Sequence, residues 1–181
     1  MPLLIALSGW LPSAALALAS WYTARAPGRG RWLFNLAGVI YALAMLALPL
    51  LPQPRFPPLL RIGLGLPLAA AGLALRAYAL SYLARQRVPS GLGAPGRLVT
   101  TGPYGVVRHP QYAGGIVFVG GWFVLWGGPS SLAALLPILG VIVFQAWVEE
   151  ALILRREFGE GHREYRRRVG MLLPRRATRQ Q

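Results

Sequence analysis

The stretch that decides the fold is 112–154, which reads YAGGIVFVGGWFVLWGGPSSLAALLPILGVIVFQAWVEEALIL. It consists of two apolar segments, at about 112–127 and 131–154, with a turn near Pro129 between them. A helix needs roughly 20 apolar residues to cross the ~30 Å hydrocarbon core of a bilayer. Two such segments joined by so short a turn predict an antiparallel pair of membrane-spanning helices, the first of which is short.

Three further apolar segments precede this pair, at about 3–22, 32–51 and 59–83. Their connections are short, and none alternates in a way that would give a helix a water-facing side. We therefore expect an all-α integral membrane bundle of about five transmembrane helices. We divide it into an N-terminal three-helix region, 1–83, and one integrated unit, 84–181, that carries a loop, the hairpin and a C-terminal interfacial helix.

Composition agrees with a membrane protein. The chain is 55% hydrophobic and 13% charged, whereas soluble domains carry about 25% charged residues. All 19 basic residues are Arg, and all five acidic residues are Glu between Glu149 and Glu164. The net charge of +14 could indicate nucleic acid, but the arginines punctuate apolar segments, which is typical of membrane orientation and anionic lipid contact. We expect membrane lipids and no nucleic acid among the partners.

The arginines also predict an orientation. Sixteen fall in connections or the tail on one side of the expected bundle, and two, Arg55 and Arg61, fall on the other. The positive-inside rule then predicts an inner (cytoplasmic) membrane protein with the N-terminus outside and the C-terminus in the cytoplasm. Arg76 alone lies inside a span, where snorkelling toward the cytoplasmic end is the simpler explanation and a role in a site is the alternative.

The first segment is expected to remain a membrane helix. Ala17 and Ala19 before Ser20 resemble a signal-peptide cleavage site, but no positive charge precedes the apolar run.

The tail from Arg155 reads RREFGEGHREYRRRVG. Phe158, His162, Tyr165 and Val169 follow helical spacing and form one stripe, while arginines occupy the other face. This pattern predicts an amphipathic helix at the membrane interface.

Several kinds of catalytic site are excluded by composition. Without Asp or Cys, a Ser-His-Asp or Cys-His arrangement is not available. Two His residues and a Glu pair, without H-E-x-x-H spacing, give no expected metal site. A G-x-G-x-x-G at Gly91, Gly93 and Gly96 follows no strand and contains Pro95, so it is interpreted as a flexible loop.

The informative polar stretch is LVTTGPYGVVRHPQYAGG, residues 98–115. Pro110 can begin the fourth helix, so His109 and Tyr112 would lie at a helix N-terminus, where partial positive charge favours an anionic ligand group.

Glu149 and Glu150 lie at the inner end of the fifth segment, and the hairpin should bring them beside His109 and Tyr112. Neighbours on a helix are about 100° apart, so we expect one carboxylate to face a ligand and the other the head-group arginines, with the tail helix as a lid. The alternative is an ion pair between Arg108 and a glutamate that only tethers the hairpin.

Together, GPYGVVRHPQY, the Glu pair, FGEGHREYRRRV and Pro174 resemble the C-terminal half of isoprenylcysteine carboxyl methyltransferases and related bacterial phospholipid or small-thiol methyltransferases. The resemblance covers about 96–174 and implies a site for S-adenosyl-L-methionine. It places the segment Gly96, Arg97, Leu98 and Val99 along the adenosine. It places Tyr104, His109, Pro110, Tyr112 and Glu150 at cofactor-contacting positions.

Two residues depart from the isoprenylcysteine enzymes. Ala146 stands where they have a substrate-binding Arg, and His162 stands where FGxxYxxY has its first Tyr. Both departures put an isoprenylcysteine carboxylate in doubt as the substrate.

We therefore expect an integral membrane methyltransferase that uses S-adenosylmethionine on a lipophilic or small acceptor (carboxylate, amine or thiol) at the cytoplasmic face. Arg108, His109 and Glu149 are the candidate catalytic residues. One alternative is an NADPH-dependent intramembrane sterol-type reductase, whose RHPNYxGE motif is altered here at Gln111 and Gly115. Another is a non-enzymatic protein that binds anionic lipid through its tail.

Overall fold

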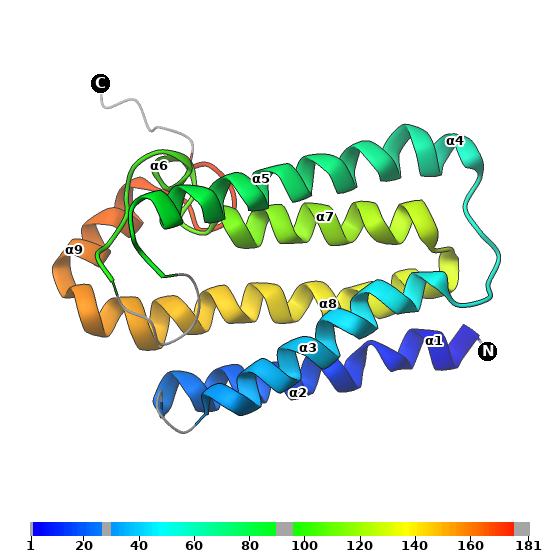
Figure 1. The fold of residues 1–181 in the computed structure, drawn as a ribbon, viewed down its shortest axis with the longest axis horizontal. Coiled ribbons are helices and arrows are strands. Elements are labelled where there is room, and N and C mark those ends of the chain that lie inside the picture. Colours follow the sequence, from blue (N-terminus) through cyan, green and yellow to red (C-terminus); the bar gives the residue numbers. More distant parts are fainter. Residues whose placement is uncertain (1, 27–29, 90–95, 176–181) are drawn as a thin grey trace.

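The protein is a helical bundle in the computed structural model, which describes residues 2–26, 30–89 and 96–175 (Figure 1). The α-helices are α1 (Pro2–Ser8), α2 (Trp10–Arg25), α3 (Arg31–Ala47), α4 (Pro58–Leu60), α5 (Leu66–Arg85), α6 (Pro103–Val106), α7 (Pro110–Trp126), α8 (Pro129–Val148) and α9 (Arg155–Arg168). A 3₁₀ turn follows α3 at Leu48–Leu50, and π-helical turns join α4 to α5 at Arg61–Gly65 and α8 to α9 at Glu149–Leu154. The described residues form no strand, so the all-helical class is confirmed.

Four helical stretches are long and apolar enough to cross a membrane. They are Leu3–Arg25, Arg31–Leu50, Pro58–Arg85 and Pro129–Arg168. The remaining segment of the expected five, α7, is not among these four. Its 17 residues give a helix of about 26 Å. Large apolar side chains on the outer surface, such as Leu11 and Leu59 at 79% and 86% exposure, suit contact with lipid.

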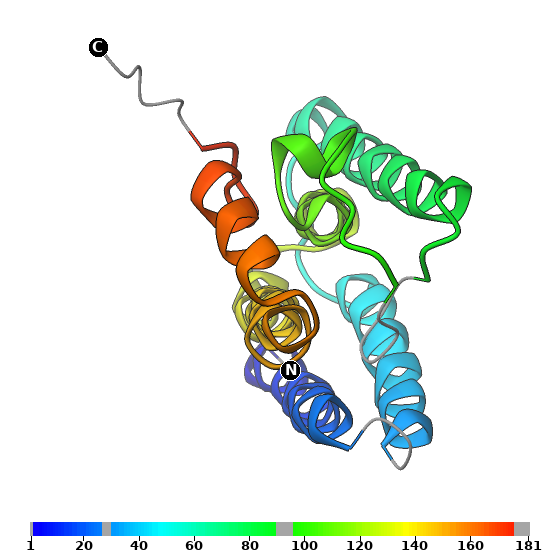
Figure 2. The ribbon, with the colours of Figure 1, turned by 90° about the vertical axis from the view of Figure 1, so that its left-hand side faces the viewer.

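The long helices lie side by side and alternate in direction (Figure 1). They pack in the order α5, α7, α8, α2, α3, and the view along the bundle shows this row bending round on itself (Figure 2). The ends of α2 and α5, the start of α3 and the whole of α9 gather at one end of the bundle, which we call the arginine-rich end. The opposite end carries the N-terminus, α4 and the turn between α7 and α8.

Glycines allow α5 and α7 to approach closely. A Cβ added at Gly72 would overlap the backbone nitrogen of Phe118, and one at Gly121 would overlap that of Ala69. A Cβ at Gly114 would lie 2.6 Å from the backbone nitrogen of Arg76. Small residues at helix contacts are a common means of close packing in membranes. This packing sets Arg76 against the first turns of α7.

The α7–α8 hairpin is formed as predicted. Ser131 caps its turn, since its Oγ accepts a hydrogen bond from the Gly128 amide at 3.0 Å and donates one to the Gly128 carbonyl at 2.8 Å. Its amide donates to Gln53 Oε1 at 3.2 Å, which ties the turn to the loop before α4. The first turn of α7 therefore lies beside the end of α8, at the arginine-rich end.

The tail helix departs from the regular stripe that the sequence predicts. Gly159 has φ 47° and ψ −115°, so α9 is kinked one residue after Phe158, and the helix ends at Arg168, before Val169. His162 and Tyr165 are buried as expected, while Phe158 and Val169 are half-buried. The physical reason is that glycine tolerates a positive φ that breaks the helical register.

Candidate functional site

The backbone before α7 is fixed to the chain that follows α9. Val107 forms a parallel β-bridge with Gly170. The Arg108 amide donates to the Gly170 carbonyl at 2.8 Å, and the His109 amide donates to the Met171 carbonyl at 3.0 Å. The loop before α7 and the tail are thus held together. We call the loop residues 107–110 the RHP corner.

Glu150 holds this corner through its side chain. Arg108 donates to both of its carboxylate oxygens, Nε to Oε1 at 2.7 Å and Nη2 to Oε2 at 3.1 Å. His109 Nε2 lies 3.1 Å from Oε1, and Arg166 Nε lies 3.4 Å from Oε2. The Arg108 and Glu150 side chains are 8% and 5% exposed, so this is a buried, bidentate pair of the strong, geometrically specific kind. The tethering ion pair considered above as an alternative is therefore present, and Glu150 makes it.

Glu149 has a different environment. Its side chain borders a cavity, and its Oε2 is buried without a hydrogen-bond partner among the described residues. The nearest basic nitrogen is His109 Nδ1, at 3.9 Å. Both glutamates begin the π-helical turn that joins α8 to α9, and such turns are frequent at functional sites. The family resemblance implied that Glu150 contacts the cofactor. In the structure Glu150 is paired with Arg108, and Glu149 is the glutamate that borders the cavity.

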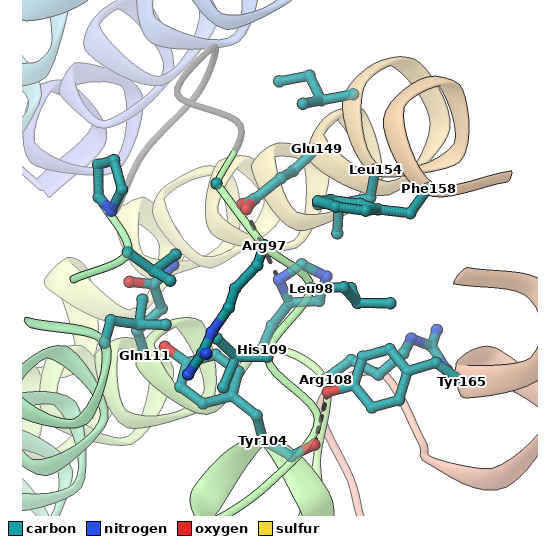
Figure 3. A pocket seen from close by; sticks show the side chains of 16 residues that line it. Arg97, Leu98, Tyr104, Arg108, His109, Gln111, Glu149, Leu154, Phe158 and Tyr165 are labelled. Carbon is teal, nitrogen blue, oxygen red and sulfur yellow. Dashed lines mark hydrogen bonds and ion pairs between the residues drawn. The ribbon is translucent and has the colours of Figure 1, made fainter. Parts of the chain in front are cut away.

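The cavity lies between the RHP corner, the end of α8 and the segment 96–99 (Figure 3). Its volume is about 70 Å³. Eight of the expected site residues border it, namely Gly96, Arg97, Leu98, Val99, Tyr104, Arg108, His109 and Glu149. Pro110, Tyr112 and Glu150 do not line it. Pro110 is fully buried at the start of α7, and Glu150 lies behind His109.

The tail helix covers one side of this cavity. Phe158 and Tyr165 both line it, and the Tyr165 hydroxyl donates to the Tyr104 carbonyl at 2.5 Å. Burial raises the pKa of the Tyr104 hydroxyl well above its ordinary value, and the nearby Glu149 and Tyr165 raise it further. The Tyr104 hydroxyl donates to the Ala79 carbonyl at 3.5 Å, which holds the ring against α5.

Apolar residues complete the cavity wall, and the sequence did not single them out. They are Leu83, Val88, Pro89, Ile153 and Leu154. No local signal distinguishes them from other apolar residues of the spans. Of the glycine motif, Gly91 and Gly93 lie outside the described residues.

Tyr112 lines a second cavity instead, deeper in the bundle and about 330 Å³ in volume. The His109 and Tyr112 rings lie 5.5 Å apart, so these two residues form part of the wall between the two cavities. Arg76 also lines the second cavity.

A cofactor of the expected type is compatible with the groups present. An orphaned carboxylate oxygen suits a ligand with ammonium and hydroxyl groups, and Arg97 supplies a cation for a ligand carboxylate. Ligand sites usually measure ~300–1,000 Å³, so the first cavity encloses only part of such a molecule in this conformation. The described residues contain no cluster of His, Cys, Asp and Glu that could hold a metal ion.

Fold and site define an all-helical protein with helices long and apolar enough to span a membrane and, at its arginine-rich end, a cavity that Glu149 borders. Residues 60–160 match the phospholipid methyltransferase family, and the chain belongs to this family. This confirms the family resemblance found in the sequence.

Two curated relatives are similar to the chain. Both are named "Probable protein-S-isoprenylcysteine O-methyltransferase", one from Oryza sativa subsp. indica and one from Oryza sativa subsp. japonica. Each is 32% identical over 78 residues, which cover 43% of this chain and 41% of the relative. The chain thus aligns with less than half the length of these relatives. No solved structure matches it. These comparisons favour neither the reductase nor the lipid-binding alternative.

Proposed function

We propose that the chain is an integral membrane methyltransferase that takes its methyl group from S-adenosylmethionine and acts on a lipophilic or small acceptor. The observation that carries the proposal is the buried, unpartnered Oε2 of Glu149 at the cavity beside the RHP corner. A buried carboxylate oxygen without a partner is costly unless a ligand satisfies it. The family match makes a methyl donor the natural ligand for this place.

Each wall of the cavity has a role in this proposal. Segment 96–99 follows the adenosine, as the family resemblance implies, and Glu149 accepts hydrogen bonds from the amino or hydroxyl groups of the cofactor. Arg97 is the available partner for the cofactor carboxylate, because Arg108 is already paired with Glu150. The bound cofactor supplies an electrophilic methyl group, and alignment of the two reactants contributes ~7–11 kcal/mol in well-ordered cases.

His109 is the residue best placed to act on an acceptor proton. Its Nε2 faces Glu150 Oε1 at 3.1 Å, and its Nδ1 lies 3.9 Å from Glu149 Oε2. A carboxylate acceptor requires no base, whereas a thiol or an ammonium acceptor must lose a proton first. In the second case His109 takes the proton, Glu149 can accept it in turn, and Glu150 positions the ring.

We also propose five membrane crossings, with α7 as the short fourth one. Its partner α5 is a candidate span, and the two helices are packed together along their length. The arginine distribution supports a cytoplasmic location for the arginine-rich end, and hence for the cofactor.

Titration of the purified full-length chain tests the proposal. S-adenosylhomocysteine should change the fluorescence of its six Trp residues saturably, and NADPH should not. Saturable binding of NADPH without binding of S-adenosylhomocysteine would refute it in favour of the reductase alternative. The variant Glu149→Gln should weaken the S-adenosylhomocysteine response, with Glu157→Gln, an exposed glutamate on α9, as the matched control.

A further inference from the structure

Arg76 is a charged group inside the bundle that uses little of its hydrogen-bonding capacity. It lies nine residues before the end of α5, about 14 Å along the helix. Its guanidinium carries five N–H donors, and the one hydrogen bond that the structure records for it runs from Nη1 to the Gln111 carbonyl at 3.1 Å. Within the described ranges, no carboxylate lies within 4.0 Å of it. The side chain therefore leans toward the arginine-rich end but stops inside the bundle.

The space beside Arg76 is the second cavity. With about 330 Å³ it is within the range of ligand sites. Most of its wall is apolar and comes from α2, α3, α5, α7 and α8, including Leu16, Phe34, Leu73, Phe118 and Ile142.

Two of the other polar groups at this cavity already have partners. The Tyr41 hydroxyl donates to the Ile138 carbonyl at 2.8 Å, and Gln145 Nε2 donates to Ser20 Oγ at 3.3 Å. Among the residues that line the cavity, Arg76 is the charged one, and it has hydrogen-bonding capacity to spare.

The cavity also lies next to the side of the bundle that is open to lipid. It is lined by both α3 and α5, which end the bent row of helices and do not pack against each other along their length (Figure 2). Leu73 on α5 is 54% exposed although it lines the cavity, and a Cβ at Gly38 on α3 would meet no atom within 4 Å. An apolar chain can therefore reach this cavity from the bilayer.

An ionisable side chain inside a membrane span is by default a candidate functional group. We propose that the second cavity binds the acceptor of the proposed methyl transfer, and that this acceptor is an amphiphile whose apolar chain fills the cavity and whose anionic end group pairs with Arg76. The inference rests on the proposed function only in calling the ligand of this cavity the methyl acceptor. The binding site itself does not depend on it.

Gly115 explains why Arg76 is left available. A Cβ at Gly115 would lie 3.4 Å from Arg76 Nη1, and Gly115 itself lines the cavity. A glutamate at this position would place a carboxylate beside the guanidinium. Glycine here leaves both the charge and the space for a ligand.

Binding of labelled amphiphiles tests the proposal. The full-length chain, in nanodiscs of zwitterionic lipid, is titrated with tritiated dodecanoate, dodecyl phosphate and dodecanol in a scintillation proximity assay. We expect at least one of the two anions to bind roughly ten- to a hundred-fold more tightly than the alcohol, as for a charge-assisted hydrogen bond. The comparison of carboxylate with phosphate then identifies the end group. Equal binding of acid, phosphate and alcohol would overturn the proposal.

Four variants locate the effect. Arg76→Gln should abolish the preference for anions, whereas Arg61→Gln should retain it. Arg61 is a matched control, because its Nε likewise donates to one carbonyl, that of Leu125 at 2.8 Å, at the opposite end of the bundle. Gly115→Glu should abolish the preference for anions. Gly115→Gln introduces a side chain that is equally large but neutral, so it should weaken the binding of all three ligands and retain the preference for anions. An unchanged preference in Arg76→Gln would refute the assignment.

Titration of each variant with S-adenosylhomocysteine separates this proposal from the previous one. A variant that binds S-adenosylhomocysteine like the parent is folded, so its loss of anion preference reports on the second cavity alone. If the parent discriminates anions but binds no S-adenosylhomocysteine, the second cavity stands and the methyltransferase proposal fails.

Discussion

Glu150 accepts two hydrogen bonds from Arg108, at 2.7 and 3.1 Å, and both side chains are almost fully buried. The pair joins the end of α8 to the RHP corner. The preceding residue, Glu149, has no such partner and borders the cavity. Two adjacent, chemically identical residues therefore have different environments, one in a buried ion pair and the other at a cavity.

This difference predicts different effects when each glutamate is replaced by glutamine. Glu150→Gln leaves Arg108 buried without its counter-charge, which costs ~3–5 kcal/mol for a broken buried pair, so the thermal unfolding midpoint should fall. Glu149→Gln should leave that midpoint near the parent value and weaken S-adenosylhomocysteine binding roughly ten- to a hundred-fold. Calorimetric titration and thermal unfolding measure the two effects. The opposite result, with Glu149→Gln unstable and Glu150→Gln defective only in binding, would restore the roles that the sequence implied.

The tail helix is expected to retain the cofactor. Phe158→Ala removes a cavity wall, and Tyr165→Phe removes the hydrogen bond to the Tyr104 carbonyl, so both should speed dissociation of S-adenosylhomocysteine. Arg167→Ala is the control, since that side chain is 79% exposed. Stopped-flow displacement gives the dissociation rates. Equal dissociation rates for the three variants would contradict the role of α9 as a lid over the cofactor.

Close packing of α5 on α7 should not tolerate large residues. Gly121→Leu should destabilise the protein strongly, because its Cβ overlaps the backbone of Ala69. Gly120→Leu should be well tolerated, since a Cβ there meets no atom within 4 Å. Thermal unfolding in detergent compares the neighbours directly. Similar midpoints for the two variants would mean that the helices are further apart than described.

The orientation is tested with reporters. A fusion after Gln181 should be cytoplasmic, and an insertion at Pro129, in the turn between α7 and α8, should be outside. The reason is the concentration of arginines at one end of the bundle. A reporter after Gln181 that is accessible from outside would reverse the side from which the cofactor enters.

Local patterns of the sequence determined the helices and the hairpin. Apolar length predicted the long segments, and Pro110 marked where α7 begins. A turn was expected near Pro129, where α8 begins. The glutamate pair and the RHP motif identified residues of the candidate site. These features depend on hydrophobicity and on helix start signals, which are properties of neighbouring residues. Family membership followed from the same stretch.

Tertiary structure alone decided which carboxylate is paired and where Arg76 points. A regular helix would place Glu149 and Glu150 about 100° apart, but it does not say which of them meets Arg108. That choice depends on the π-helical turn and on the β-bridge between Val107 and Gly170, which sets the RHP corner against the tail. Likewise, Arg76 lines a cavity because glycines allow α5 to approach α7, and because α3 supplies another part of the wall of that cavity. Such positions result from contacts between segments far apart in the chain, which no local pattern of residues records.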